Sequence, residues 1–180
     1  ASGLASRVSY DPARLTEAVK NAGLTGQSVT LLVNSSDGIR LRAARAIAAM
    51  LSQCGLKVTT SEQSDSSYRK ALSNGKFDLY LGQTKLSPNM DLSAFFASKG
   101  ALSYGSMNDP ILYALCQESL ANAGNYYTLH KTVMDNGLLC PVLFRSYAVY
   151  ASRGLISSLT PARDSVFFHT SGRTLEDAKK

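Results

Sequence analysis

The chain has 180 residues, of which 44% are hydrophobic and 18% charged, a composition typical of a globular domain and not of a disordered chain. Its formal net charge is +6, but its 19 basic residues are scattered, with only Arg40, Arg42 and Arg45 close together, so no nucleic-acid partner is predicted. No apolar run reaches the roughly 18 residues of a membrane-spanning helix, and the first residues lack the pattern of a signal peptide.

The first predicted element is a helix that begins at Asp11 and Pro12, because aspartate caps helices and proline suits their first turn. Apolar residues recur at helical spacing until Gly23, which ends the helix. The β-rich run SVTLLVN at 28–34 and the turn at 35–38 then predict a strand that leads into a second helix.

This second helix is predicted from about Ile39 to Cys54, with its apolar residues on one stripe. Gly55 ends it and a strand follows at 56–60, so the segment forms a βαβ unit. Parallel pairing with a right-handed crossover is the expected consequence.

The next cycle repeats this order, with a Ser-rich turn at 64–67 before a short helix that Asn74 and Gly75 close. The segment 77–81 is then a predicted strand, and the polar loop 82–89 follows it. Such a loop lies at the carboxyl end of its strand, where open α/β sheets gather their ligand-contacting loops.

Further helices are expected over 91–97, from Asp109 to Leu120 and after Asn125, and a strand or pair of strands over 141–150. The whole pattern predicts an α/β fold with a mixed, partly parallel sheet flanked by helices.

The search for chemical motifs is mostly negative. The sequence has no glycine-rich phosphate loop, no nucleophile elbow and no HExxH motif, and His130 and His169 have no partners at metal-ligand spacing. Cys54, Cys116 and Cys140 form no CxxC, allow at most one intramolecular pair, and are predicted to be buried thiols. We therefore predict no catalytic residue, no metal and no cofactor.

The order of the segments resembles the large C-terminal lobe of the family 5 extracellular solute-binding proteins, the peptide and nickel binders of ABC importers. The resemblance covers about residues 10 to 170 and is carried by DPARLTEAVKNAGL, SVTLLVN, AARAIAAMLSQCGLKVTT, YRKALSNGKFDLYLG, DLSAFF, NDPILYALCQES and CPVLFRSYAVYASRGL. The joints CGLKV and NGKFDLYLG are its most specific marks.

This resemblance implies one lobe of a bilobal fold like that of the type II periplasmic binding proteins, with residues 1–165 as the C-terminal lobe. Residues 166–180 would form a return strand toward the missing N-terminal lobe and a flexible tail. The implied function is the binding of an oligopeptide or similar small molecule for an ABC importer, without catalysis. The implied partners are the solute, the permease and the missing lobe, and the implied location is extracytoplasmic, in the periplasm or lipid-anchored at the cell surface.

In peptide-binding members of the family, the loop after this strand usually reads Gly-Trp, and an aspartate a few residues on pairs with the ligand's α-amino group. Here Gln83 follows Gly82 and no acid appears before Asp91, so that contact is not carried over. The residues expected to face the solute are Gln83, Thr84, Lys85, Asn34, Tyr104 and Asn108, with Lys85 as the candidate partner of an anionic group. A solvated turn in which Asp91 caps the next helix is the other interpretation of this loop.

Two other functions stay open at this point. A ligand-sensing domain of a transcription regulator uses the same kind of lobe, and a helix-turn-helix in the flanking sequence would identify it. A small hydrolase or transferase needs a nucleophile beside a base, which the sequence does not offer at a recognisable spacing.

Overall fold

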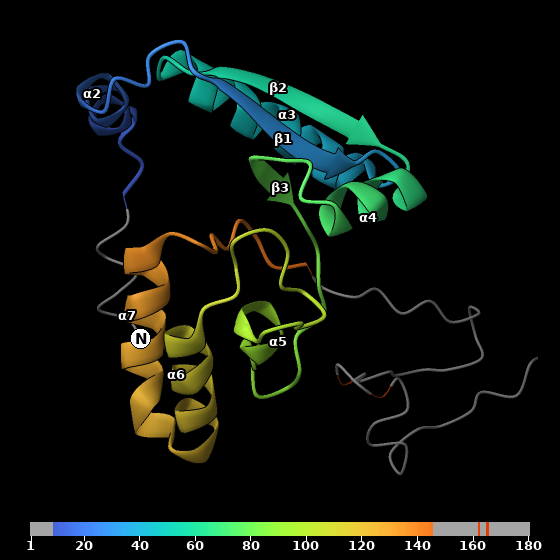
Figure 1. The fold of residues 1–180 in the computed structure, drawn as a ribbon, viewed down its shortest axis with the longest axis vertical. Coiled ribbons are helices and arrows are strands. Elements are labelled where there is room, and N and C mark those ends of the chain that lie inside the picture. Colours follow the sequence, from blue (N-terminus) through green and yellow to red (C-terminus); the bar gives the residue numbers. More distant parts are fainter. Residues whose placement is uncertain (1–8, 146–161, 163–164, 166–180) are drawn as a thin grey trace, which may run out of the picture. The chain divides into compact units, whose positions relative to one another are not determined.

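A computed structural model describes residues 9–145, 162 and 165 of the chain (Figure 1). The chain divides into two compact units, Ala1–Leu138 and Leu139–Lys180, and the helices and strands of the described residues belong to the first. In chain order they are α2 (Pro12–Asn21), β1 (Ser28–Asn34), α3 (Gly38–Gln53), β2 (Lys57–Gln63), α4 (Asp65–Ser73), β3 (Leu79–Leu81), α5 (Ser93–Phe96), α6 (Pro110–Ala121), the 3-10 turn η1 (Ala123–Asn125) and α7 (Tyr126–Asn136).

The sheet of the described residues has the order β2-β1-β3, and both neighbours run parallel to β1. Ser28 pairs with Lys57 on one side of β1, and Leu31 pairs with Leu79 on the other. The chain thus passes from β1 to β2, crosses back over β1 and enters β3. These findings confirm the predicted βαβ unit and the α/β class.

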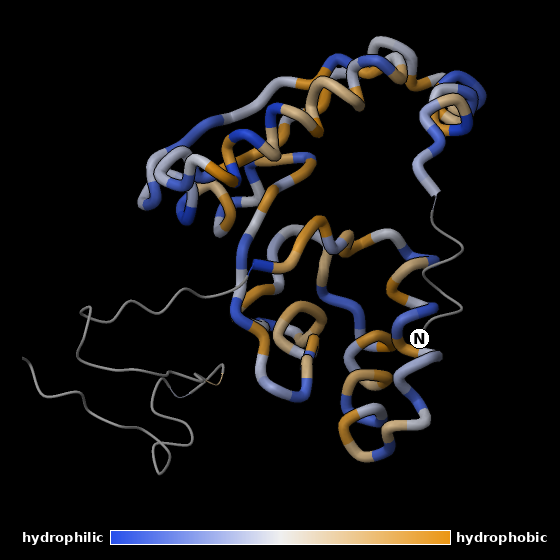
Figure 2. Tube along the Cα trace, turned by 180° about the vertical axis from the view of Figure 1, so that it is seen from behind, coloured by the Kyte–Doolittle hydropathy of each residue, from blue (hydrophilic) through white to orange (hydrophobic). Residues whose placement is uncertain are grey.

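Both faces of the central strand β1 are buried. Leu31 and Val33 pack with Ala44 and Ala48 of α3, whereas Leu32 packs with Tyr68 and Leu72 of α4. Successive side chains of a strand point to opposite faces, so one apolar run supplies the core on each side of the sheet. Hydrophobic and hydrophilic segments accordingly alternate along the helices that cover it (Figure 2).

Aspartate side chains begin helices where the sequence predicts them. Asp11 accepts a hydrogen bond from the amide of Arg14 at 2.9 Å at the start of α2. Asp109 accepts from the amides of Ile111 and Leu112, both at 2.9 Å, at the start of α6. These contacts satisfy amide groups that have no partner within the first turn of a helix.

The third strand is shorter than the predicted 77–81, and the residue before it, Asp78, contacts Thr30 through both its backbone and its side chain. Its amide donates to the Thr30 carbonyl at 3.2 Å, whereas the Thr30 amide donates to Asp78 Oδ2 at 2.7 Å, and the regular pairing of β3 begins at Leu79. The second strand, in contrast, continues beyond the predicted end at residue 60 to Gln63.

Two expectations for residues after α7 are not met. Cys54 and Cys116 are buried as predicted, but Cys140 is exposed. Residues 141–145 form no strand, and Val142, Leu143 and Phe144 are exposed together with Cys140. The rest of the predicted 141–150 strand lies outside the described residues.

Replacing Leu32 by alanine tests the two-sided burial of β1. The side chain is fully buried, at 0% exposure, so we expect Leu32→Ala to lower the free energy of unfolding by about 2–5 kcal/mol. Leu79→Ala in β3 is the matched control, because Leu79 is 42% exposed and its loss should cost about 1 kcal/mol or less. Urea unfolding followed by circular dichroism measures both, and equal losses would contradict the described core.

Candidate functional site

The strand order places a switch point between β1 and β3. From β1 the chain leaves toward β2 on one side, and β3 lies on the other side. Val33 pairs with Leu81, so Asn34 and Gly82 follow at the same edge of the sheet. Open α/β sheets bind ligands outside the carboxyl ends of their strands at such a point. We call the residues that meet here the strand-end cluster: Asn34, Asp65, Tyr68, Arg69, Gly82 and Tyr104.

Asn34 is the buried polar centre of this cluster. It is 2% exposed, its Nδ2 donates to Asp65 Oδ1 at 2.8 Å, and its Oδ1 accepts from the amide of Ser36 at 2.9 Å. The side chain, which the sequence suggested as a solute contact, therefore uses its polar atoms within the protein. It joins the end of β1 to the first turn of α4.

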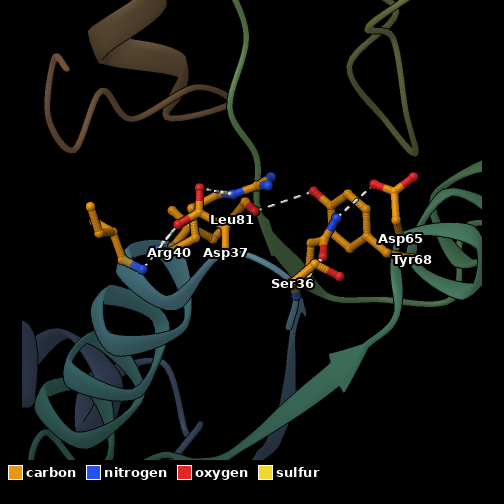
Figure 3. A network of polar contacts seen from close by, with 8 residues as sticks. Ser36, Asp37, Arg40, Asp65, Tyr68 and Leu81 are labelled. Carbon is orange, nitrogen blue, oxygen red and sulfur yellow. Dashed lines mark hydrogen bonds and ion pairs between the residues drawn. The ribbon is translucent and has the colours of Figure 1, made fainter. Parts of the chain in front are cut away.

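Charged residues surround Asn34 at the surface. Asp65 accepts a second hydrogen bond, from Arg69 Nε at 2.8 Å, and this contact contributes most to a lowered pKa of Asp65. Nearby, Arg40 Nε lies 3.3 Å from Asp37 Oδ2. Figure 3 shows both aspartates and Tyr68 at this edge. Two ion pairs, Arg40 with Asp37 and Arg69 with Asp65, therefore lie near the strand ends.

Tyr68 ties α4 to the end of β3. Its hydroxyl donates to the carbonyl oxygen of Leu81 at 3.2 Å (Figure 3), and burial raises the pKa of Tyr68 to about 12. A Cβ atom at Gly82 would lie 3.1 Å from Cε2 of Tyr80 and 3.7 Å from the Tyr68 hydroxyl oxygen. A larger residue at position 82 would force the Tyr80 ring to move, so glycine suits the start of this loop.

An aromatic contact brings Tyr104 to the cluster from a distant loop. Its ring meets Tyr80 edge to face at 6.0 Å between centroids, and the Tyr80 hydroxyl donates to Met107 Sδ at 3.3 Å. Phe77 supports Tyr80 from another side, at 5.1 Å between centroids. Tyr104, predicted as a site residue, is thereby held against the end of β3.

The loop after Gly82 is exposed at its start and tied down at its far end. Gln83, Thr84 and Lys85 are exposed, although Gln83 and Lys85 do have contacts within the chain. At the far end, the Tyr126 hydroxyl donates to the carbonyl of Asn89 at 3.1 Å, and Asp91 accepts from the amide of Ser93 at 2.8 Å.

The predicted site residues are therefore placed unequally. Asn34 and Tyr104 belong to the strand-end cluster, and residues 83–85 follow it directly on the exposed loop. Asn108 is exposed beside the cap residue Asp109, and no contact between it and the cluster is found among the described residues.

Sequence reasoning missed Asp65, Tyr68 and Arg69, because it interpreted this segment only as the start and face of a short helix. One signal could have found them. The segment directly follows β2, and the carboxyl ends of all parallel strands meet at one edge of a sheet.

Residues outside the cluster offer little chemistry. His130 is exposed on α7, where its ring lies near Tyr126. Within the part of the chain that the structure describes, no three His, Cys, Asp or Glu residues gather as a metal site. No described helix is both long and apolar enough to cross a membrane.

The raised pKa of Tyr68 predicts a pH dependence of stability. The usual value of 10.0 rises to about 12 in the folded state, so the unfolded chain loses this proton first. The stabilisation is complete below pH 10 and is lost as the pH rises toward 12. We expect the free energy of unfolding to fall less steeply over that range in Tyr68→Phe than in the wild type, as measured by urea unfolding. Tyr127→Phe, at a 46% exposed side chain, is the control and should keep the steeper fall; identical slopes in all three proteins would refute the assignment.

Comparisons with solved structures give the fold of the chain. The Escherichia coli murein tripeptide binding protein MppA matches with a TM-score of 0.59 and 19% identity, over 70% of this chain and 27% of that protein. Brucella suis NikA in complex with Fe(III)-EDTA matches with a TM-score of 0.55 and 21% identity, over 71% and 30%. The substrate-binding domain of a Bacillus anthracis oligopeptide ABC transporter matches with a TM-score of 0.53 and 20% identity, over 69% and 26%.

The chain thus spans about a quarter to a third of the length of these proteins, as expected for one lobe of a periplasmic-binding-protein fold. No sequence among the curated proteins matches it. The family model of the bacterial extracellular solute-binding proteins, family 5 Middle, matches residues 2–103, more than half of the chain. The chain therefore belongs to the family 5 bacterial extracellular solute-binding proteins.

Proposed function

We propose that this chain is one lobe of an extracytoplasmic receptor that binds a solute and presents it to the permease of an ABC importer. Its family consists of extracellular solute-binding proteins that are not enzymes. The observation that carries the proposal is the strand-end cluster, which lies at the switch point of a parallel sheet. That is where this class of fold binds small molecules.

The proposed mechanism is reversible binding, with no covalent bond made or broken. A second, N-terminal lobe closes over the solute and excludes water, and the permease recognises the closed form. We propose that residues 1–165 belong to the C-terminal lobe and that residues 166–180 supply a return strand toward the other lobe and a flexible tail. A secretion signal or lipid anchor belongs to the same proposal.

Within this lobe, we assign the direct solute contacts to Gln83, Thr84, Lys85 and Tyr104. The first three are exposed at the end of β3, and Tyr104 lies against the same strand end through Tyr80. Asn34 supports the site without contacting the solute, because its side-chain nitrogen and oxygen both form hydrogen bonds within the protein. Asn108 belongs to the outer rim of the proposed contact surface.

The solute class follows from the polar character of these strand ends. Amide, hydroxyl and charged groups suit an oligopeptide or a similarly polar small molecule. Two of the solved structures similar to this chain are a murein tripeptide binding protein and NikA in complex with Fe(III)-EDTA, so trialanine and Fe(III)-EDTA are suitable first probes.

Calorimetry on the 180-residue chain and on the full-length protein tests the two-lobe proposal. An isolated lobe supplies half of the contacts while association still costs several kcal/mol of lost freedom, so we expect at most millimolar affinity from the chain alone. The full-length protein should bind its solute at least about a hundredfold more tightly. Micromolar binding by the 180-residue chain would contradict this prediction.

The reading frame around these residues supplies an independent check. A secretory or lipidated N-terminus and a further α/β region are expected on the transport proposal. A helix-turn-helix would instead identify a ligand-sensing domain of a transcription regulator.

A further inference from the structure

Two arginines of this lobe form ion pairs of different geometry. Arg45 binds Glu62 through two nitrogens, with Nε 2.7 Å from Oε1 and Nη2 2.8 Å from Oε2. Arg69 contacts Asp65 through Nε alone, at 2.8 Å. Among the described residues, no hydrogen bond from the terminal nitrogens of Arg69 is found. The guanidinium of Arg69 is therefore held at one edge, and its fork of terminal nitrogens is available to another acceptor.

The carboxylate that holds Arg69 is itself fixed. Asp65 accepts from Nδ2 of Asn34 at 2.8 Å through its other oxygen, and Asn34 is 2% exposed at the end of β1. An ordinary ion pair on a solvated helix face has no such third member. Here a buried amide orients a carboxylate, which orients an arginine whose side chain is 75% exposed.

The arrangement is located where a solute would meet it. Asp65 belongs to the first turn of α4, at the same edge as the ends of β1 and β3. The hydrogen bond to Asp65 contributes most to a raised pKa of Arg69, and the Tyr104 phenol adds a smaller contribution. Tyr104, held by Tyr80, thus lies within electrostatic range of the guanidinium.

The charges nearby do not oppose an anion. Asp37 pairs with Arg40, and Asp65 pairs with Arg69. Asp65 also accepts a hydrogen bond from the side-chain amide of Asn34. A planar guanidinium fork matches the two oxygens of a carboxylate.

We propose that Arg69 binds a carboxylate group of the solute through its terminal nitrogens, with Asp65 and Asn34 as the positioning residues that aim it. The proposal rests on the proposed function and specifies its solute class, a small molecule that bears a carboxylate. It assigns the recognition of this group to α4, beside the loop after β3.

The test is an NMR titration of the 15N-labelled 180-residue chain, in which weak binding is visible. Two carboxylates, acetate and trialanine, are compared with acetamide and trialanine amide, which lack that carboxylate. We expect both carboxylates to shift the Nε–Hε signal of Arg69, together with the backbone amides of Asn34 and Gly82. The amides should shift the Arg69 signal little, and Arg45 should not respond.

Variants then separate the role of Arg69 from simple charge. Arg69→Gln should weaken carboxylate binding by about tenfold or more. Arg45→Gln removes the same charge elsewhere and should leave binding unchanged, and Arg69→Lys should bind less tightly than wild type because lysine offers no planar fork. Thermal unfolding of each variant confirms that it is folded.

The possible failures are distinguishable. If acetate or trialanine perturbs Asn34 and Gly82 but not Arg69, or if Arg45→Gln reduces binding as much as Arg69→Gln, the assignment of Arg69 is overturned while the solute site stands. If no probe perturbs any amide at the strand ends, the location of the solute site in the proposed function fails together with it.

Discussion

The burial of β1 on both faces is the constraint on which the rest of the lobe depends. Leu31 and Val33 require a cover on one side, and Leu32 requires one on the other. A strand with two apolar faces needs other elements packed against both faces of its sheet. The helices α3 and α4 supply the two covers, and the chain can place them there only by crossing to both sides of β1. The switch point, and with it an edge where strand ends diverge, follows from that demand.

The polar cluster follows from the way β1 ends. Asn34 is the last residue of the strand and is still buried, and a buried amide without partners would cost about 1–3 kcal/mol. Its hydrogen bonds to Asp65 and to the Ser36 amide satisfy both of its ends. These bonds also fix the first turn of α4 relative to the end of β1. The requirement to satisfy one buried side chain thus orients the charged residues that face solvent.

The hydrophobic pattern predicted much of this architecture because it reflects burial directly. The LLV run, the alanine-rich stripe of the following helix and the glycine that closes it were sufficient for the βαβ unit. The helix caps at Asp11 and Asp109 could also be predicted, but side-chain contacts between segments far apart in the sequence could not. The Asp78 carboxylate accepts the hydrogen bond of the Thr30 amide directly before β3, and composition carries no sign of it.

The site was predictable only in part for the same reason. A loop after a strand is visible in the sequence, so residues 83–85 could be proposed. The approach of Tyr104 depends on its ring contact with Tyr80, and the cluster on α4 depends on a hydrogen bond across 31 positions between Asn34 and Asp65. Cys140 shows the limit of predicting burial from an apolar run. Such a run is buried only where another segment covers it, and among the described residues Cys140 stays exposed.

The exposure of the charged members of the cluster bears on the proposed second lobe. The side chains of Arg69 and Asp65 are 75% and 55% exposed, and water screens the attraction between such groups and any charged solute. A lobe that closes over the strand ends would remove that water and strengthen each charge-assisted hydrogen bond at once. The free energy of closure would then come largely from bonds that the open lobe has already oriented. In the proposed receptor, an arginine that Asp65 already orients would lose less side-chain freedom when the solute arrives.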